Sequence, residues 1–139
     1  MKGVYILLVE IIDEITLRVG HLGEVSFKPG LYVYVGSAQN NLEKRVSRHF
    51  SKEKKIRWHI DYLLSSRSCK PLKAIAYSLK REYECIISNL LLEIGGNPVR
   101  RFGSTDCKCF SHLYKIEEFE EIKKKIEESL KVKPIFTHS

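Results

Sequence analysis

The sequence lacks any apolar run long enough to span a bilayer, and it has no internal repeat and no low-complexity tract. Met1 and Lys2 lead directly into a strand-like segment, so the start of the chain does not have the pattern of a signal peptide. We therefore expect a cytoplasmic protein that has no membrane partner.

Acidic residues are scarcer than basic ones, with 17 Asp and Glu against 24 Lys and Arg, which gives a net charge of +7 and a pI near 9.2. Such a balance favours a polyanionic partner. The length of 139 residues and the 43% hydrophobic content are typical of a single globular domain. We expect a core over residues 1–116, an amphipathic helix over 117–132 and a tail over 133–139.

Cysteine is also sparse, and the spacing of the four cysteines fits no familiar zinc motif. Cys107, Cys109 and His112 offer three ligands, for which Cys69, Cys85 or His59 would be the fourth. Disulfides would need an oxidising compartment, or a hyperthermophilic cytosol. We favour small buried thiols instead, and do not expect a structural zinc.

The stretch from Leu31 to Phe50 organises the rest of the chain. Alternating tyrosine and valine over residues 32–35 predicts a strand, and Gly36 with Ser37 is predicted to end it. A helix over 42–50, capped by Asn40 or Asn41, should follow. Helical periodicity places Arg45 and His49 together on the edge of its packed face, near the preceding strand.

The remaining elements alternate between strands and helices. We predict a doubly buried strand over 3–9, a hairpin over 15–27, a short helix around 60–64, strands over 72–79 and 112–116, and helices over 81–94 and 117–132. The fold class is thus α/β (α+β), with a small, mainly antiparallel sheet flanked by helices.

Glu84 is a carboxylate on a helix that is apolar nearly all round. A buried carboxylate without a partner is costly, so Glu84 should meet a metal ion or a cation such as Arg81. Plainer alternatives exist for the other polar residues. Tyr5 and Tyr34 are also consistent with ordinary sheet tyrosines, and Arg45 with His49 is consistent with a half-exposed helix edge.

The residues Gly3-Val4-Tyr5 and Tyr34-Val35-Gly36, followed by Arg45 and His49, resemble the GIY-YIG nuclease superfamily. The central motif is similar to the nuclease domain of the excision-repair protein UvrC, where a tyrosine usually replaces His49. The segments around Trp58-His59, Glu84-Cys85 and 103–113 resemble a prokaryotic branch that is sometimes fused to a DNA-repair glycosylase. The hairpin over 15–27 departs from the usual short link between the two tripeptides.

This resemblance implies a GIY-YIG-like fold with an inserted hairpin, and hydrolysis of phosphodiester bonds in DNA by a metal-dependent endonuclease that is structure-directed and acts in repair. It implies Mg²⁺ (or Mn²⁺) on Glu84, with Arg45 stabilising the charge of the transition state. Tyr5 is the preferred acceptor of a proton from the attacking water, with Tyr34 beside it and His49 as a phosphate ligand or proton relay. His59, Asp106 and His112 are candidates for supporting positions around the site.

A basic segment follows the predicted helix over 42–50. A run of lysines is most often a solvated surface, but here it is also a candidate for binding nucleic acid. The residues expected to contact the nucleic-acid backbone are Lys44, Arg48, Lys52, Lys54, Lys55 and Arg57. The expected partners are DNA, with RNA left open, and an associated DNA-repair glycosylase. Two other functions stay open, namely a nucleic-acid-binding module that keeps the fold without cutting, and a domain that binds an acidic protein.

Overall fold

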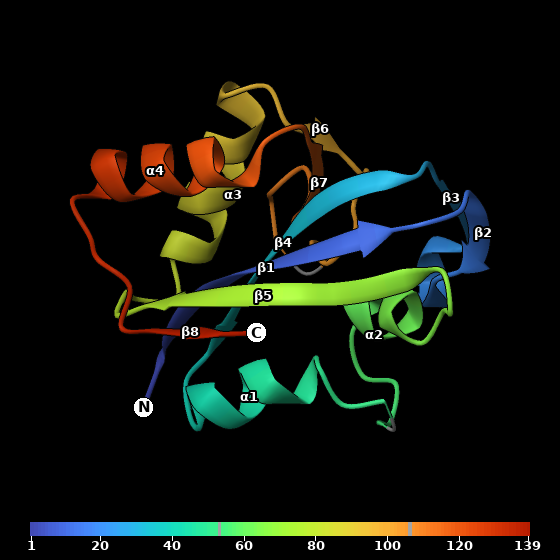
Figure 1. The fold of residues 1–139 in the computed structure, drawn as a ribbon, viewed down its shortest axis with the longest axis horizontal. Coiled ribbons are helices and arrows are strands. Elements are labelled where there is room, and N and C mark those ends of the chain that lie inside the picture. The colour runs from blue at the N-terminus through green and yellow to red at the C-terminus, as the bar shows by residue number, and fades with distance from the viewer. Residues whose placement is uncertain (53, 106) are drawn as a thin grey trace.

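The structure is a computed structural model that describes residues 1–52, 54–105 and 107–139. Within these residues a central sheet lies between two pairs of helices (Figure 1). Across the sheet the strands are β6 (Asn97–Pro98), β7 (Leu113–Ile116), β4 (Gly30–Ala38), β1 (Gly3–Ile11), β5 (Cys69–Tyr77) and β8 (Phe136–His138). All the paired strands are antiparallel, which confirms the predicted fold class.

The helices α1 (Leu42–Arg48) and α2 (His59–Leu64) cover one face of the sheet, and α3 (Tyr83–Glu93) and α4 (Phe119–Leu130) cover the other (Figure 1). Because side chains alternate along a strand, β1 supplies both cores. Tyr5 and Leu7 pack toward α1 and α2, whereas Val4 and Ile6 pack toward α3 and α4. The prediction that β1 is buried on both faces is confirmed.

The strands β1 and β4 are the centre of the sheet and pair over their whole lengths, from Gly3 opposite Ala38 to Ile11 opposite Gly30. The predicted hairpin is present between them as β2 (Ile15–Arg18) and β3 (Glu24–Phe27), joined through a 3-10 turn at Gly20–Leu22. It forms a separate two-stranded sheet, so the insertion does not interrupt the β1–β4 pairing.

The prediction that Gly36 and Ser37 end the central strand is wrong. Both residues continue β4, where Gly36 pairs with Tyr5 and Ser37 pairs with Val4. A Cβ atom on Gly36 would lie 2.5 Å from the Tyr5 ring, so the glycine makes room for the tyrosine. The glycine is required by close packing and not by a turn.

Two end regions also differ from expectation. Asn41 occupies the position before α1, but it has a left-handed φ of 48° and its side chain makes no capping hydrogen bond. The segment 133–139, predicted as a tail, contains β8, which pairs with β5 from Ala76 to Ala74. Among the described residues, no helix is both long and apolar enough to cross a bilayer.

Candidate functional site

A polar pocket of about 240 Å³ lies beside the end of β4. The neighbouring strand β7 pairs with β4 only from Leu31 to Tyr34, so the edge of β4 from Val35 onward is not covered by a strand. Residues from both faces of the sheet meet at this edge. The lining residues are Tyr34, Gly36, Ser37, Ala38, Gln39, Arg45, Trp58, Arg81, Glu84 and Gly103.

Tyr5, Tyr34 and His49 form a buried group directly behind this pocket. The Tyr5 hydroxyl lies 2.6 Å from Nε2 of His49, and the ring centroids of Tyr5 and Tyr34 are 6.5 Å apart. Tyr5 is fully buried, whereas Tyr34 retains 5% exposure and lines the pocket. Of the two tyrosines, the structure therefore turns Tyr34 toward the pocket, although Tyr5 was predicted to face the attacking water.

Burial sets the protonation of this group. Desolvation raises the pKa of Tyr5 and of Tyr34 well above the ordinary value of a phenol, despite the opposing positive charge of Arg45. Desolvation, together with the charge of Arg45, lowers the pKa of His49 to about 3. Near neutral pH the two tyrosines are phenols and His49 is an uncharged imidazole.

Arg45 reaches the pocket from α1, where it stacks on Trp58. Its guanidinium carbon lies 3.6 Å from the centroid of the Trp58 ring. The Nε atom of Arg45 is buried and has no hydrogen-bond partner among the described residues. A buried donor of this kind is costly unless something binds it, and the guanidinium that carries it lines the pocket and brings a positive charge there.

Glu84 enters the same pocket from α3 on the opposite face of the sheet. Its Oε2 accepts a hydrogen bond from the Ser37 hydroxyl, and its Oε1 lies 3.2 Å from Nε2 of His112. The side chain is 24% exposed. Glu84 was expected to meet a metal or a cation such as Arg81, and the ion-pair partner that the structure gives it is His112.

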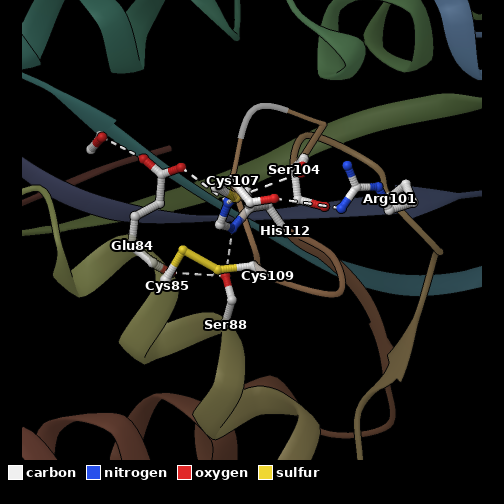
Figure 2. Close-up of a disulfide and its surroundings, with 9 residues drawn as sticks. Glu84, Cys85, Ser88, Arg101, Ser104, Cys107, Cys109 and His112 are labelled. Carbon is white, nitrogen blue, oxygen red and sulfur yellow. Dashed lines mark hydrogen bonds and ion pairs between the residues drawn. A yellow bond between two sulfur atoms is a disulfide. The ribbon is translucent and has the colours of Figure 1, made fainter.

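A cluster of sulfur and imidazole ligands lies next to Glu84 (Figure 2). The ligand atoms of Cys85, Cys107, Cys109 and His112 all lie within 4.8 Å of one another, so this cluster could hold a metal ion. In the structure Cys85 and Cys109 are joined as a disulfide, with a sulfur–sulfur distance of 2.04 Å. Of the three fourth ligands considered from the sequence, the fold selects Cys85.

The predicted nucleic-acid-binding residues separate into two groups. Arg48 donates from both terminal nitrogens to the buried carboxylate of Asp61, at 2.9 and 3.1 Å. Lys54 donates to three backbone carbonyls at the end of α1, those of Arg48, His49 and Ser51. The side chains of Arg48 and Lys54 therefore stabilise the fold through intramolecular hydrogen bonds. The exposed members of the set are Lys44, Lys52, Lys55 and Arg57.

The candidates for supporting positions also have different surroundings. His59 accepts a hydrogen bond at Nδ1 from the backbone of the pocket residue Gly103, and its ring contacts Phe102. His112 touches both Glu84 and the sulfur cluster. The prediction for Asp106 falls outside the described residues.

Sequence reasoning missed three residues of the site. Trp58 was quoted only as part of a motif, yet it is the single tryptophan of the chain and follows a basic segment, which marks it as a stacking partner. Ser37 was interpreted only as part of the end of the central strand. Ser88, one helical turn after Glu84, joins Glu84 and His112 through its hydroxyl, and no signal in the sequence identifies it.

Residues 4–134 match the family model described as domain of unknown function DUF123. The chain belongs to the DUF123 family. The match begins within β1 and ends after α4, so it includes Val4 and Tyr5 of the first tripeptide, the whole second tripeptide, the pocket and the sulfur cluster. No curated protein and no solved structure matches the chain.

Proposed function

We propose that this DUF123 protein is a metal-dependent endonuclease that hydrolyses phosphodiester bonds in DNA. The proposal agrees with the resemblance of its tripeptides to the GIY-YIG nucleases. One observation supports it most strongly. A guanidinium, a carboxylate and a phenol from three elements, Arg45, Glu84 and Tyr34, line one polar pocket.

Arg45 is the group for the charge of the scissile phosphate. Stacking on Trp58 fixes the plane of its guanidinium, and the buried Nε provides a donor that nothing in the described residues uses. A fixed, permanently charged donor in a partly enclosed pocket stabilises the extra charge of a phosphoryl transition state. Lysine cannot reproduce the planar stacked geometry.

Glu84 is the residue that would hold the metal ion. Its carboxylate and the adjacent Ser37 hydroxyl are hard oxygen donors at the edge of a polar pocket, which suits Mg²⁺ or Mn²⁺. When bound, such an ion would polarise the phosphate and stabilise the leaving oxygen. Tyr34 presents its phenol to the same pocket from β4.

The buried pair of Tyr5 and His49 has a supporting part in this scheme. Tyr5 packs beside Tyr34 and shares a hydrogen bond with His49, so the pair supports the ring of Tyr34 and the end of α1. Its raised and lowered pKa values keep it uncharged near neutral pH. Of the two tyrosines Tyr34 lines the pocket, so we assign it the part of proton acceptor; burial raises the pKa of its phenol, and the positive charge of Arg45 opposes this rise.

Four exposed cations, Lys44, Lys52, Lys55 and Arg57, would contact the nucleic-acid backbone without reading its sequence. Selectivity would then come from the shape of the substrate, as a structure-directed repair enzyme requires. Association with a DNA-repair glycosylase in the cytoplasm is part of the same proposal.

The test is a cleavage screen with Mg²⁺ and with Mn²⁺ on labelled flapped, branched, nicked and intact duplex DNA, and on RNA of the same sequence. Cleavage of branched DNA by the wild type is expected, with a loss of about 100-fold or more in Glu84→Gln and in Arg45→Lys. Glu82→Gln and Arg18→Lys are the matched controls, because both residues are exposed and neither belongs to the proposed pocket or to the proposed nucleic-acid contacts.

Other outcomes of the screen identify other functions. Salt-sensitive binding without cleavage in either metal would replace the enzyme by a nucleic-acid-binding module. Cleavage that survives Glu84→Gln would overturn the assignment of the site. Indifference to every nucleic acid would leave a domain that binds an acidic protein.

A further inference from the structure

We propose that Cys85, Cys107, Cys109 and His112 bind one Zn²⁺ in the reduced protein, and that the Cys85–Cys109 disulfide is the oxidised alternative of the same site. Three thiolates and one imidazole form one of the common donor sets for tetrahedral structural zinc. With zinc–sulfur bonds of about 2.3 Å, the sulfur atoms of such a site lie about 3.8 Å apart. The four ligand atoms here all lie within 4.8 Å of one another, so small side-chain adjustments would complete the tetrahedron.

The backbone holds the ligands in place from two sides. Cys85 lies in the first turn of α3, and the other three ligands lie on the segment that leads into β7. The backbone of His112 is fixed twice, because its N–H donates to Phe102 and its carbonyl accepts from Val35 on β4, each at 2.8 Å. Another backbone hydrogen bond, from the N–H of Arg101 to the carbonyl of Phe110, closes the loop that carries Cys107 and Cys109.

The hydrogen-bond network assigns the tautomer of His112. The Ser88 hydroxyl donates its proton to the carbonyl oxygen of Glu84 at 2.8 Å, so the Ser88 Oγ atom is left to accept from Nδ1–H of His112 at 2.6 Å. In the neutral imidazole the lone pair is then on Nε2, which lies 3.3 Å from the sulfur of Cys107 (Figure 2); only the protonated ring forms the ion pair between Nε2 and Glu84. A histidine whose other nitrogen donates to a fixed oxygen is the usual form of a metal ligand.

Cys85, in the first turn of α3, is only partly buried. Cys107 is partly exposed, which gives an ion access to the cluster. The remaining cysteine, Cys69, belongs to the core on the other face of the sheet, where burial raises the pKa of its thiol to about 12. Only the clustered cysteines therefore qualify as ligands within the described residues.

The disulfide and the zinc site exclude each other, because the disulfide occupies two of the four ligands. Reduction by a dithiol breaks the Cys85–Cys109 bond, transfers two electrons and two protons to the two sulfurs, and leaves the dithiol as a cyclic disulfide. Zn²⁺ then replaces the thiol protons of Cys85, Cys107 and Cys109, which are released to solvent.

The test is a Co²⁺ titration of the full chain, reduced with dithiothreitol and desalted without oxygen. The expected result is one equivalent of Co²⁺ per chain, with the sulfur-to-cobalt charge-transfer bands and d–d bands of a tetrahedral thiolate site, displaced by one equivalent of Zn²⁺. The Cys107→Ser variant should bind at least about 100-fold more weakly, since the loss of an outer partner alone costs about 10- to 100-fold. The Cys69→Ala variant is the matched control and should titrate like the wild type.

A second measurement covers variants that fail to fold. Zinc-loaded and zinc-depleted wild type are alkylated, and the modified cysteines are mapped by mass spectrometry. Zinc should protect Cys85, Cys107 and Cys109 together, and air oxidation of the depleted protein should abolish the Co²⁺ bands. Absence of these bands in the folded, reduced wild type, or equal metal affinity in the oxidised protein, would overturn the proposal. Neither result depends on nuclease activity, so the two proposals can fail separately.

Discussion

The hydroxyl of Tyr5 on β1 lies 2.6 Å from Nε2 of His49, which immediately follows α1, and both side chains are buried. This contact joins the first signature tripeptide to the helix that carries Arg45. Burial holds His49 uncharged, and this makes the stability of the fold depend on pH.

Substitution of His49 by glutamine should remove part of this pH dependence. The pKa of His49 is about 3 in the folded protein and 6.5 in the unfolded chain, so between these values the unfolded state binds more protons. The free energy of unfolding therefore decreases as the pH falls below 6.5, by up to about 1.4 kcal/mol per pH unit. Urea denaturation of wild type and His49→Gln from pH 4.5 to 7.5 measures the difference in slope.

The charged groups around His49 would otherwise complicate this comparison. Those that affect its pKa are Arg45, Asp61, Lys54 and Arg48. All of them remain in the variant, so the difference between the two slopes isolates the imidazole. Parallel slopes in the two proteins would mean that His49 is solvated or charged in the folded state.

The Gly36→Ala variant should be destabilised by steric conflict with Tyr5. The new Cβ would lie 2.5 Å from the Cζ and hydroxyl oxygen of the tyrosine, and overpacking of this kind costs about 1–3 kcal/mol. In a Tyr5→Leu background these atoms are missing, so the same substitution should cost less. Urea midpoints of the four proteins form a double-mutant cycle, and strict additivity would refute the conflict.

The Arg48→Ala variant should lose stability even though Arg48 was predicted to contact DNA. It would leave the fully buried carboxylate of Asp61 without its guanidinium. The expected cost is about 3 kcal/mol, toward the lower end for a broken buried pair, because Asp61 keeps the backbone donors of Arg57 and Trp58. Lys44→Ala, on the exposed side of the same helix, should change stability by less than about 0.5 kcal/mol. A midpoint for Arg48→Ala equal to that of Lys44→Ala would assign Arg48 to the surface after all.

The Ser88→Ala variant should weaken metal binding at the sulfur cluster without removing a ligand. The Ser88 hydroxyl accepts from Nδ1–H of His112, and the loss of such a partner costs about 10- to 100-fold in metal affinity. Competition between the protein and a chromophoric zinc chelator measures the change. Ser78→Ala, at an exposed serine that is not part of the cluster, serves as the control, and equal affinities in both variants would exclude this role.

Zinc loading should raise the proposed nuclease activity relative to the disulfide form. Nε2 of His112 lies 3.2 Å from Oε1 of Glu84, and it cannot bind zinc and keep this contact. Zinc at the sulfur cluster would thus release a carboxylate oxygen to the pocket. Cleavage rates of zinc-loaded and oxidised protein at the same Mg²⁺ concentration test this, with Cys69→Ala behaving as the wild type. Equal rates, with zinc binding confirmed, would mean that the two sites are independent.

The sequence allowed the fold class and most elements to be predicted, because the signals were local. The doubly buried β1, the inserted hairpin and the apolar α3 all follow from periodicity and turn residues. Gly36 was misinterpreted because its partner Tyr5 lies 31 positions earlier in the chain. In the sequence, a glycine that makes room for such a side chain cannot be told from a glycine that ends a strand. The short β8 has no periodic signal and exists only because β5 offers an unpaired edge.

The site was predictable where a motif fixed it and not where tertiary contacts did. Tyr34, Arg45 and Glu84 were chosen from the family resemblance and line one pocket. Arg48 forms an ion pair with Asp61 because of the way α2 packs on the sheet. Cys85, and not Cys69, joins the sulfur cluster because of the way α3 packs. No spacing along the chain encodes these choices.

The register of β1 against β4 brings the two tripeptides together as one structural unit. Tyr5 of the first tripeptide pairs with Gly36 of the second, and its ring packs over the glycine. The hairpin β2–β3 between them forms a separate two-stranded sheet. The length of the inserted hairpin can therefore vary without changing the pairing of β1 with β4. Searches for distant homologues should match the Tyr5–Gly36 pair and allow any number of residues between the two tripeptides.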